Sequence, residues 1–293
     1  MNIKNFLRRF YIFYLLKGYI KVNNKYYFLK NNKFYSSPSL RQALILKSYV
    51  RCDDFYEQRE EAPSYFLKKL INHNSIIIDI GGNLGYSALY YSRILQSFGN
   101  GQCLSFEPVS ENFSHMIFNF GRLTNVMFFN FGISYKTDDI EFGVPQYSEK
   151  YEEINTGLYT SKNVDKDYIL EKCKVCKLDD VIKLFCKESS TIDYIKLDIE
   201  GSEMDALKGA KQTLIEHSPI VQVEYNINTT SKEEHSYLKE YLKDLHYKPH
   251  AICNSIFDEV TGYEVFFIKN DILELLKNDK DFLNLFKDIS NEN

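Results

Sequence analysis

Cysteine is scarce in this sequence, and its few positions form no regular pattern. Six cysteines occur among 293 residues, too few for the dense disulfide framework that holds small secreted domains together. The one close pair, Cys173 and Cys176, has no second pair of ligands at the spacing of a structural zinc site. We therefore expect reduced thiols and no zinc site.

Long apolar runs are also missing from the N-terminal region. The run from Phe10 to Leu16 is bounded by Arg9 and Lys17, whereas a membrane-spanning helix needs about 20 apolar residues. The same region has no small-residue cleavage site of the kind that ends a secretory signal. Both absences predict a cytoplasmic protein and leave peripheral contact with the inner face of the membrane open.

Acidic residues are absent from the beginning of the chain. The first 50 residues contain ten lysines and arginines and no aspartate or glutamate, which leaves 26 basic and 40 acidic residues for the rest. Phenylalanine and tyrosine are interleaved with these bases, a pattern suited to anionic lipid head groups or nucleic acid. We predict residues 1–52 to be a basic, aromatic N-terminal extension. Two hypotheses stay open for it, contact with an anionic membrane surface and packing on the main domain as a short helix and hairpin; no nucleic-acid partner is expected.

The rest of the chain, residues 53–293, alternates apolar runs with helical patterns. This alternation predicts one α/β domain with a parallel sheet and crossover helices. Strands are expected at Ser75–Ile80, Gln102–Glu107, Val126–Phe131, Ile192–Asp198, Ile220–Glu224 and Tyr263–Ile268. Helices are expected at Glu203–His217, where Ser202 and Asp205 have capping-box spacing, and at Asp271–Ile289.

Residues 135–190 interrupt this alternation with a polar, acidic and turn-rich sequence. We expect an irregular excursion there, and such segments often carry substrate contacts. No internal repeat or low-complexity linker divides the domain further.

A glycine turn follows the first expected strand of this domain. The stretch IIIDIGGNLGYSALYY places Asp79 at the end of the strand, then Gly81, Gly82 and Gly85 in the turn, and then a helical pattern. A dinucleotide-binding turn would have the spacing G-x-G-x-x-G, which is not present here. Asp79 would also repel a phosphate and attract an amine or another cation. The turn therefore favours a positively charged ligand over a dinucleotide.

A second acidic residue closes the next expected strand. Glu107 lies 22 residues after Gly85, where a carboxylate can accept hydrogen bonds from ribose hydroxyls. S-adenosylmethionine combines a ribose with a positively charged amino acid part and a sulfonium. We expect its methionine part by the glycine turn, its ribose on Glu107 and its adenine near the loop after the third strand. The predicted cofactor-binding residues are Asp79, Gly81, Gly82, Asn83, Gly85, Glu107, Gly132 and Ile133.

These motifs occur together with others in a familiar order. IIIDIGGNLGYSAL, LSFEPVSENF, CKLDDVI and IDYIKLDIEGSEMDALKGAKQTL resemble the FkbM family of S-adenosylmethionine-dependent methyltransferases in order and spacing, from Ile76 to Asn226. Gly82 departs from the family, which usually has alanine there; we expect a looser turn that still binds the cofactor. The resemblance implies a Rossmann-like, seven-stranded class I methyltransferase sheet with helices on both faces. It also implies methyl transfer to a hydroxyl of a sugar or secondary metabolite.

Three acidic residues follow the later strands. Asp198, Glu200 and Glu224 are expected at carboxyl ends of strands, where open α/β sheets bind their ligands. We predict them to be catalytic residues that bind the acceptor or remove its proton, although each could instead be structural, as a turn cap or in the field of a helix N-terminus. Lys196 lies inside a buried strand and so needs an acidic partner, for which Asp198 is the simplest candidate.

The acids leave two chemical routes open. Three converging carboxylates could hold a divalent cation that lowers the pKa of the acceptor hydroxyl, or one carboxylate could act alone as the base. The six histidines form no constellation, and we expect no metal. The predicted function is S-adenosylmethionine-dependent O-methyl transfer to a carbohydrate, such as a surface polysaccharide precursor. A cofactor-binding module without turnover is the alternative, and the glycine spacing disfavours a nicotinamide oxidoreductase.

Overall fold

The computed structural model describes residues 19–22, 25–31, 33–37, 40–51, 60–99, 101–145, 168–225, 231–253 and 263–290. Its centre is an eight-stranded sheet in the order β14-β12-β13-β11-β10-β4-β5-β6. The strands are β4 (Ser75–Ile80), β5 (Gln102–Phe106), β6 (Val126–Phe129), β10 (Thr191–Leu197), β11 (Ile220–Tyr225), β12 (Tyr247–Ile252), β13 (Tyr263–Lys269) and β14 (Phe286–Asp288). The five strands from β6 to β11 run parallel, and β13, β12 and β14 are added antiparallel.

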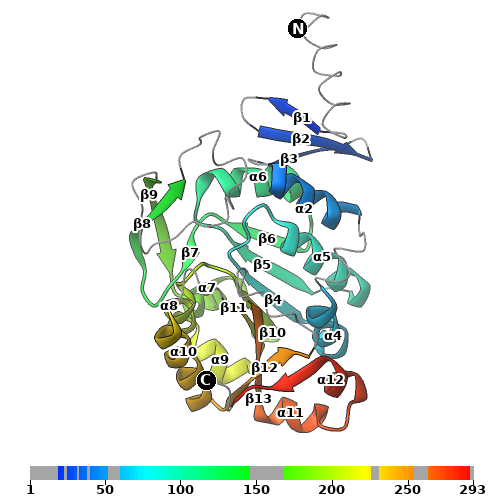
Figure 1. The fold of residues 1–293 in the computed structure, drawn as a ribbon, viewed down its shortest axis with the longest axis vertical. Helices are drawn as coiled ribbons and strands as arrows, with labels where there is room; N and C mark the ends of the chain where they lie inside the picture. The colour runs from blue at the N-terminus through cyan, green and yellow to red at the C-terminus, as the bar shows by residue number, and fades with distance from the viewer. Residues whose placement is uncertain are drawn as a thin grey trace, which may run out of the picture.

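Each strand divides its side chains between two hydrophobic cores, one on each face of the sheet. In β4, Ile77 belongs to the first core, whereas Ile76 and Ile78 belong to the second. Because both faces are covered, the parallel strands read as continuous apolar runs. The first core is completed by α2 (Leu40–Arg51), α4 (Glu61–Leu70), α5 (Tyr86–Phe98), α6 (Ser110–Phe120), α11 (Asn270–Leu276) and α12 (Lys280–Leu285). The second is completed by α7 (Leu178–Phe185), α8 (Glu203–Gly209), α9 (Lys211–His217) and α10 (Lys232–Asp244) (Figure 1).

The predicted Rossmann-like α/β fold is confirmed, and all six expected strands are present. The sheet has one strand more than the seven expected, because β14 is added at its edge. The single helix predicted at Asp271–Ile289 is therefore wrong. Asp279 caps a new helix there, since its carboxylate accepts from the backbone N–H groups of Asp281 and Phe282, both at 3.0 Å. Phe286 then continues as a strand buried in the first core.

The single helix predicted at Glu203–His217 is also wrong, because it divides into α8 and α9 at Ala210. Gly209 ends α8 where the helix passes against the backbone at Ser134. A Cβ atom on Gly209 would lie 2.0 Å from the Ser134 carbonyl oxygen, so only glycine fits, and glycine weakens a helix interior. The capping box expected at Ser202 is absent, since this side chain makes no capping hydrogen bond.

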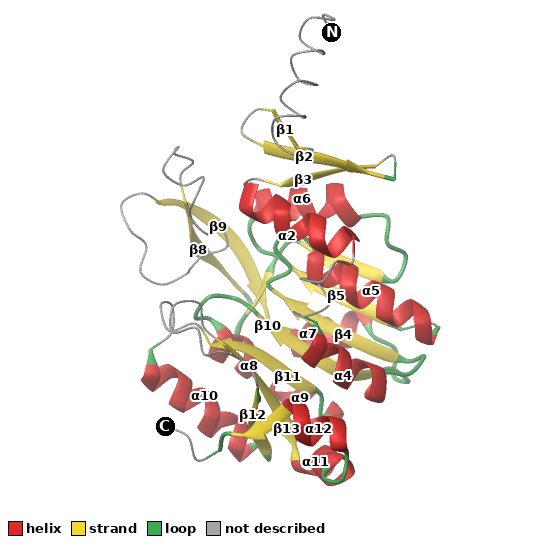
Figure 2. Ribbon diagram, turned by 45° about the vertical axis from the view of Figure 1, so that its right-hand side comes forward, coloured by secondary structure: helices red, strands yellow, loops and turns green. Residues whose placement is uncertain are grey.

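Residues 135–190 are mostly regular where they are described, so the predicted irregular excursion is wrong for that part. A three-stranded sheet is formed by β7 (Gly132–Ile133), β8 (Asp138–Pro145) and β9 (Tyr168–Cys176). Figure 2 shows β8 and β9 as a hairpin that stands out from the main sheet. Cys173 and Val175 are buried with Phe142, whereas the lysines beside them are exposed, which is the alternation of a strand. Residues 146–167 lie outside the described residues.

The N-terminal extension contributes a second small sheet. Its strands are β1 (Tyr19–Val22), β2 (Lys25–Lys30) and β3 (Lys33–Ser37), all antiparallel, and α2 follows them. Tyr26 and Phe28 of β2 are buried in the first core together with Leu46 and Tyr49 of α2. The described part of the extension therefore packs on the main domain, whereas residues 1–18 lie outside the described residues. Among the described residues, no helix has the length and apolar character needed to span a membrane.

Candidate functional site

A row of polar side chains crosses the main sheet close to the carboxyl ends of its parallel strands. Ser105, Asp79, Lys196 and Gln222 are neighbours in register on β5, β4, β10 and β11, and all four are buried. Ser105 Oγ donates to Asp79 Oδ2 at 2.7 Å, and the Tyr194 hydroxyl donates to Gln222 Oε1 at 2.6 Å. Buried polar groups need hydrogen-bond partners, and these bonds hold the four side chains in place. The row lies directly below the strand ends, where the glycine turn and the acidic residues follow.

The glycine turn begins two residues after Asp79 and is tied to the neighbouring strand. The backbone N–H groups of Gly81 and Gly82 both donate to the Phe106 carbonyl, at 3.0 and 2.8 Å. Gly81 has a φ of 91°, and a Cβ atom there would lie 2.0 Å from the Asp198 carbonyl oxygen. Only glycine can adopt this conformation so close to another backbone. The turn is thereby held against the residues that follow β10.

The departure of Gly82 from alanine has a steric explanation. A Cβ atom on Gly82 would lie 2.3 Å from Ser105 Oγ and 3.4 Å from Asp79 Oδ2. The glycine therefore leaves room for the Ser105 hydroxyl, which in turn donates to Asp79. Gly82 and Ser105 form a matched pair in this chain.

Asp79 is fully buried beneath the turn, and its pKa is raised by burial, with Lys196 and Ser105 opposing that shift. One of its oxygens, Oδ1, has no hydrogen-bond partner among the described residues, and the same is true of Asn83 Oδ1. Two buried acceptors without partners near the turn fit a ligand that donates hydrogen bonds, as the ammonium group of S-adenosylmethionine does. The cation that Asp79 meets within the chain itself is Lys196, its neighbour in register. Its contact with the cofactor stays a prediction.

Glu107 is buried directly after β5 and links the turn to α6. Its Oε2 accepts from the backbone N–H of Asn83 and its Oε1 from that of Val109, both at 2.9 Å, and Asn112 adds a side-chain hydrogen bond. Burial raises the pKa of Glu107 to about 7, although these hydrogen bonds oppose the shift. Each carboxylate oxygen can accept a second hydrogen bond, so ribose hydroxyls remain acceptable partners.

Gly132 and Ile133, predicted near the adenine, form β7. Gly132 pairs with Val175 and Ile133 with Cys176 of β9. The Ile133 side chain is buried in the second core. The adenine contact of this pair stays a prediction.

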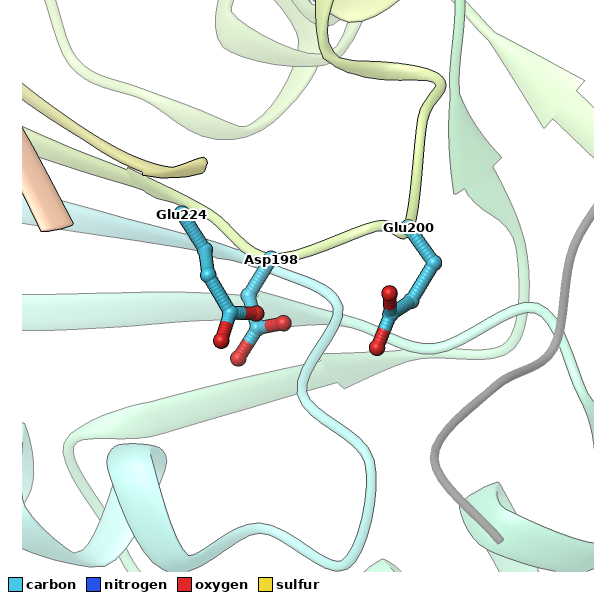
Figure 3. Close-up of side chains that lie close together, drawn as sticks. All are labelled: Asp198, Glu200 and Glu224. Atoms are coloured by element: carbon cyan, nitrogen blue, oxygen red, sulfur yellow. The ribbon is translucent and has the colours of Figure 1, made fainter. Parts of the chain in front are cut away.

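The three predicted catalytic acids lie together. Figure 3 shows Asp198, Glu200 and Glu224 with their side chains on the same side of the strand ends. One carboxylate oxygen from each lies within 4.8 Å of the others, and all three residues are half-buried. The three acids thus lie together at the strand ends, and their catalytic role stays a prediction.

Asp198 and Glu200 are held by a tight turn between β10 and α8. Glu200 has a φ of 52° and Gly201 a φ of 100°, so the chain reverses in left-handed conformations. Glu203 stabilises this reversal, because its Oε1 accepts from the N–H of Gly201 at 3.1 Å and of Ile199 at 3.3 Å. The buried Glu203 thus fixes the backbone turn that carries the two acids.

Hydrogen bonds and charge link Lys196 to Asp198, and Asp198 to Glu224. Lys196 Nζ donates to Asp198 Oδ2 at 2.8 Å, which confirms the predicted partner. The pKa of Glu224 is raised to about 10, chiefly because of the negative charge of Asp198, then burial, a hydrogen bond with Asp198, and Glu200. At neutral pH Glu224 therefore keeps a proton, which it shares with Asp198 in their hydrogen bond. The two carboxyl groups take up and release protons as a coupled pair.

The same acids could ligate a divalent cation, since hard cations prefer carboxylate oxygens. However, Lys196 already donates to Asp198, and Glu224 keeps its proton at neutral pH. A cation would have to displace both, so the geometry suits hydrogen bonds to an uncharged acceptor at least as well. The expectation of a site without metal stays a prediction.

Helix α6 supplies residues that were not predicted. Asn112 bonds to Glu107, and Met116 would contact a Cβ atom on Gly82 or Gly85 at 3.1 and 2.8 Å. Phe120 closes the same side of Gly85. Asn112, Met116 and Phe120 recur every four residues in ENFSHMIFNF, which places them on one face of a helix, and this spacing is the signal that could have found them.

Comparison with known proteins gives one family. The family described as "Methyltransferase FkbM domain" matches residues 79–249. Over 192 residues, the chain is 26% identical to "2-O-methyltransferase NoeI" of Sinorhizobium fredii (strain NBRC 101917 / NGR234), which covers 60% of this chain and 76% of the relative.

Two solved structures are similar to parts of the chain. The FkbM methyltransferase of Methylobacillus flagellatus KT has a TM-score of 0.44 at 17% identity and covers 78% of this chain, which spans 59% of that protein. Fibrillarin of Aeropyrum pernix, solved with natively bound S-adenosyl-L-methionine, has a TM-score of 0.41 at 11% identity and covers 86% of this chain and 98% of its own.

Proposed function

The chain belongs to the FkbM methyltransferase family, and we propose that it transfers the methyl group of S-adenosylmethionine to a hydroxyl oxygen of a carbohydrate. The cofactor would be held by the glycine turn from Gly81 to Gly85 and by Glu107. The acceptor would lie on Asp198, Glu200 and Glu224.

One observation carries this proposal: the glycine turn and the acidic cluster adjoin each other. Gly81 is packed against the Asp198 backbone so closely that a Cβ atom there would lie 2.0 Å from its carbonyl oxygen. The Asp198 N–H also donates to the Ile80 carbonyl at 3.1 Å, immediately before the turn. A cofactor on the turn and an acceptor on the acids would therefore be neighbours, and holding two reactants in this way supplies much of the catalysis of a displacement reaction.

Bound S-adenosylmethionine would supply an electrophilic methyl group. The task of the chain is to orient the acceptor oxygen and to take its proton. Asp198 is suited to the second role, because the ammonium group of Lys196 lies 2.8 Å from its Oδ2 and a nearby positive charge favours a carboxylate. The hydrogen bond between Glu224 and Asp198 would orient this base, and general-base assistance is typically worth about 10²–10⁴ in rate.

A carbohydrate acceptor agrees with the chemistry of the cluster. Three carboxyl groups within 4.8 Å of one another offer several acceptor oxygens to adjacent hydroxyls, and each ionised carboxylate can accept from more than one. The relative from Sinorhizobium fredii is named a 2-O-methyltransferase, which supports oxygen as the methylated atom. A surface polysaccharide precursor in the cytoplasm is the acceptor that we propose.

The first test measures cofactor binding. Calorimetric titration of the purified chain should detect S-adenosylmethionine and its demethylated product but not NAD. Glu107→Ala should weaken that binding roughly tenfold or more, because each lost hydrogen bond to a charged group is worth about 1.5–3 kcal/mol. Glu171→Ala, on the projecting hairpin, is the matched control and should leave the binding unchanged. Glu171 also accepts a hydrogen bond from a backbone N–H, that of Ser110 in α6 at 2.9 Å.

The second test measures the acceptor. Glycans from cells with and without the protein should differ in mass by one CH₂ group, and the purified chain should transfer a labelled methyl group to the lighter form. Binding of the cofactor without transfer to any glycan would instead support a binding module without turnover. Exclusive binding of NAD would contradict the entire proposal.

A further inference from the structure

The small N-terminal sheet has an exposed apolar face. Leu29 of β2 and Phe34 of β3 are cross-strand partners and are 45% and 48% exposed. Tyr27, two residues from Leu29 and thus on the same face of β2, packs edge-on against Phe118 of α6 with ring centroids 6.2 Å apart. Phe118 is itself 51% exposed. We call Tyr27, Leu29, Phe34 and Phe118 the apolar face.

Basic residues flank the apolar residues along the small sheet. Lys25, two residues before Tyr27, shares that face of β2. Lys30 and Lys33 form the cross-strand pair next to Leu29 and Phe34. A negatively charged surface would attract these lysines.

The extension has no acidic residues of its own to neutralise these bases. No aspartate or glutamate occurs among the first 50 residues. Lys25 forms an ion pair with Glu111 of α6 at 3.3 Å. Residues 1–18, which lead into β1, continue the mixture of aromatic, aliphatic and basic residues. Net positive charge is therefore a property of the extension as a whole.

We propose that the apolar face contacts an anionic lipid bilayer. Aromatic and aliphatic side chains at the level of the head groups gain from burial, and flanking lysines and arginines gain from the negative surface potential. The charge of the extension selects this occupant, because a second copy of the same basic surface would be repelled. The proposal is independent of methyl transfer and would bring the enzyme to lipid-linked acceptors.

Helix α6 joins the apolar face to the cofactor turn. Phe118 belongs to the apolar face, whereas Asn119, one residue on, accepts from the Ser36 N–H at 2.8 Å and donates to the Ser36 carbonyl at 3.0 Å. His115 adds a hydrogen bond to Ser36 Oγ at 2.8 Å. Met116 on the same helix packs on the glycine turn. The surface is thus fixed to the catalytic domain through a buried polar contact.

Sedimentation of the full-length chain with lipid vesicles tests the proposal. The chain should sediment with phosphatidylcholine vesicles that contain phosphatidylserine, should do so less at high salt, and should remain in solution with pure phosphatidylcholine. Leu29→Ser with Phe34→Ser should lower the partition coefficient at least fivefold. The matched control is Leu275→Ser with Leu283→Ser, which replaces residues that are 79% and 57% exposed on α11 and α12 and should leave binding unchanged.

The charge contribution has its own pair of variants. Lys25→Gln, on the same face of β2 as Leu29, should weaken binding by about fivefold, the usual order for one base at an anionic surface, whereas Lys280→Gln on α12 should have no effect. Unaltered thermal unfolding shows that each variant is folded. Binding of Leu29→Ser with Phe34→Ser at the parental level would overturn the proposal and assign the membrane contact to another part of the chain. Conversion of a parental dimer to a monomer by that variant would identify the face as a contact between copies, which also overturns it.

Discussion

The ammonium group of Lys196 lies 2.8 Å from Oδ2 of Asp198. Lys196 is also the cross-strand neighbour of Asp79 in β4. One buried cation therefore serves two carboxylates, one beneath the glycine turn and one in the acidic cluster. A buried ionic group costs free energy unless it is paired, so each of the two acids depends on Lys196. This relationship connects the glycine turn with the acidic cluster.

Removal of Lys196 should destabilise the protein. Lys196→Met leaves Asp79 and Asp198 without their cation, and the loss of one partner of a buried pair costs about 3–5 kcal/mol. Chemical denaturation at neutral pH should show a decrease of that order in the free energy of unfolding. Lys208→Met, which removes an exposed lysine 4.0 Å from Asp205, should change it by no more than about 1 kcal/mol. Equal decreases in the free energy of unfolding for the two variants would show that Lys196 contributes no more to stability than an exposed lysine.

Stability should fall as the pH rises from 5 to 8, and Glu224 should be one cause. The pKa of Glu224 is raised to about 10 and that of Glu107 to about 7, both from 4.5. Between these limits the folded protein keeps protons that the unfolded chain releases, so increasing pH favours unfolding. Glu224→Gln should flatten the fall in melting temperature, whereas Glu240→Gln on the exposed side of α10 should not. Parallel pH profiles for the parent and Glu224→Gln would contradict the raised pKa.

Gly82 and Ser105 should be energetically coupled. Gly82→Ala places a Cβ atom where Ser105 Oγ now lies and should destabilise the protein by about 1–3 kcal/mol, the usual cost of overpacking. Ser105→Ala removes that oxygen, so the double variant should be more stable than the sum of the single effects. Urea denaturation of the four proteins measures this coupling, which for residues in contact is typically about 0.5–3 kcal/mol. Strictly additive effects would argue against the matched pair.

The strands and the acidic cluster could be predicted because their signals are local. Continuous apolar runs mark the parallel strands, and an acid that follows such a run must lie at the carboxyl edge of the sheet. Asp198, Glu200 and Glu224 met at that edge for this reason. The partner of Lys196 could be predicted because a lysine in a buried strand needs an acidic partner, and the acid two residues on is one of few candidates.

Other features depend on contacts that are distant in sequence. The break between α8 and α9 coincides with the close approach of Gly209 to Ser134, and nothing near Gly209 in the sequence announces that contact. The strand β14 exists because β12 presents a free edge to pair with it. The need for glycine at position 82 arises from Ser105, in the neighbouring strand. Local patterns specify which elements form, whereas packing between elements decides where they stop.

Asp198 is the residue that we expect to take the proton of the acceptor hydroxyl during methyl transfer. The most direct test of this role is the rate of labelled methyl transfer to the glycan acceptor by the parent and by Asp198→Asn, with cofactor affinity measured on the same samples. Asparagine keeps the shape of the side chain and removes its charge. We expect S-adenosylmethionine to bind with nearly parental affinity while the rate falls by about 10²–10⁴, the range of general-base assistance. Methyl transfer by Asp198→Asn at the parental rate would contradict it and leave Asp198 with the structural role of holding Lys196.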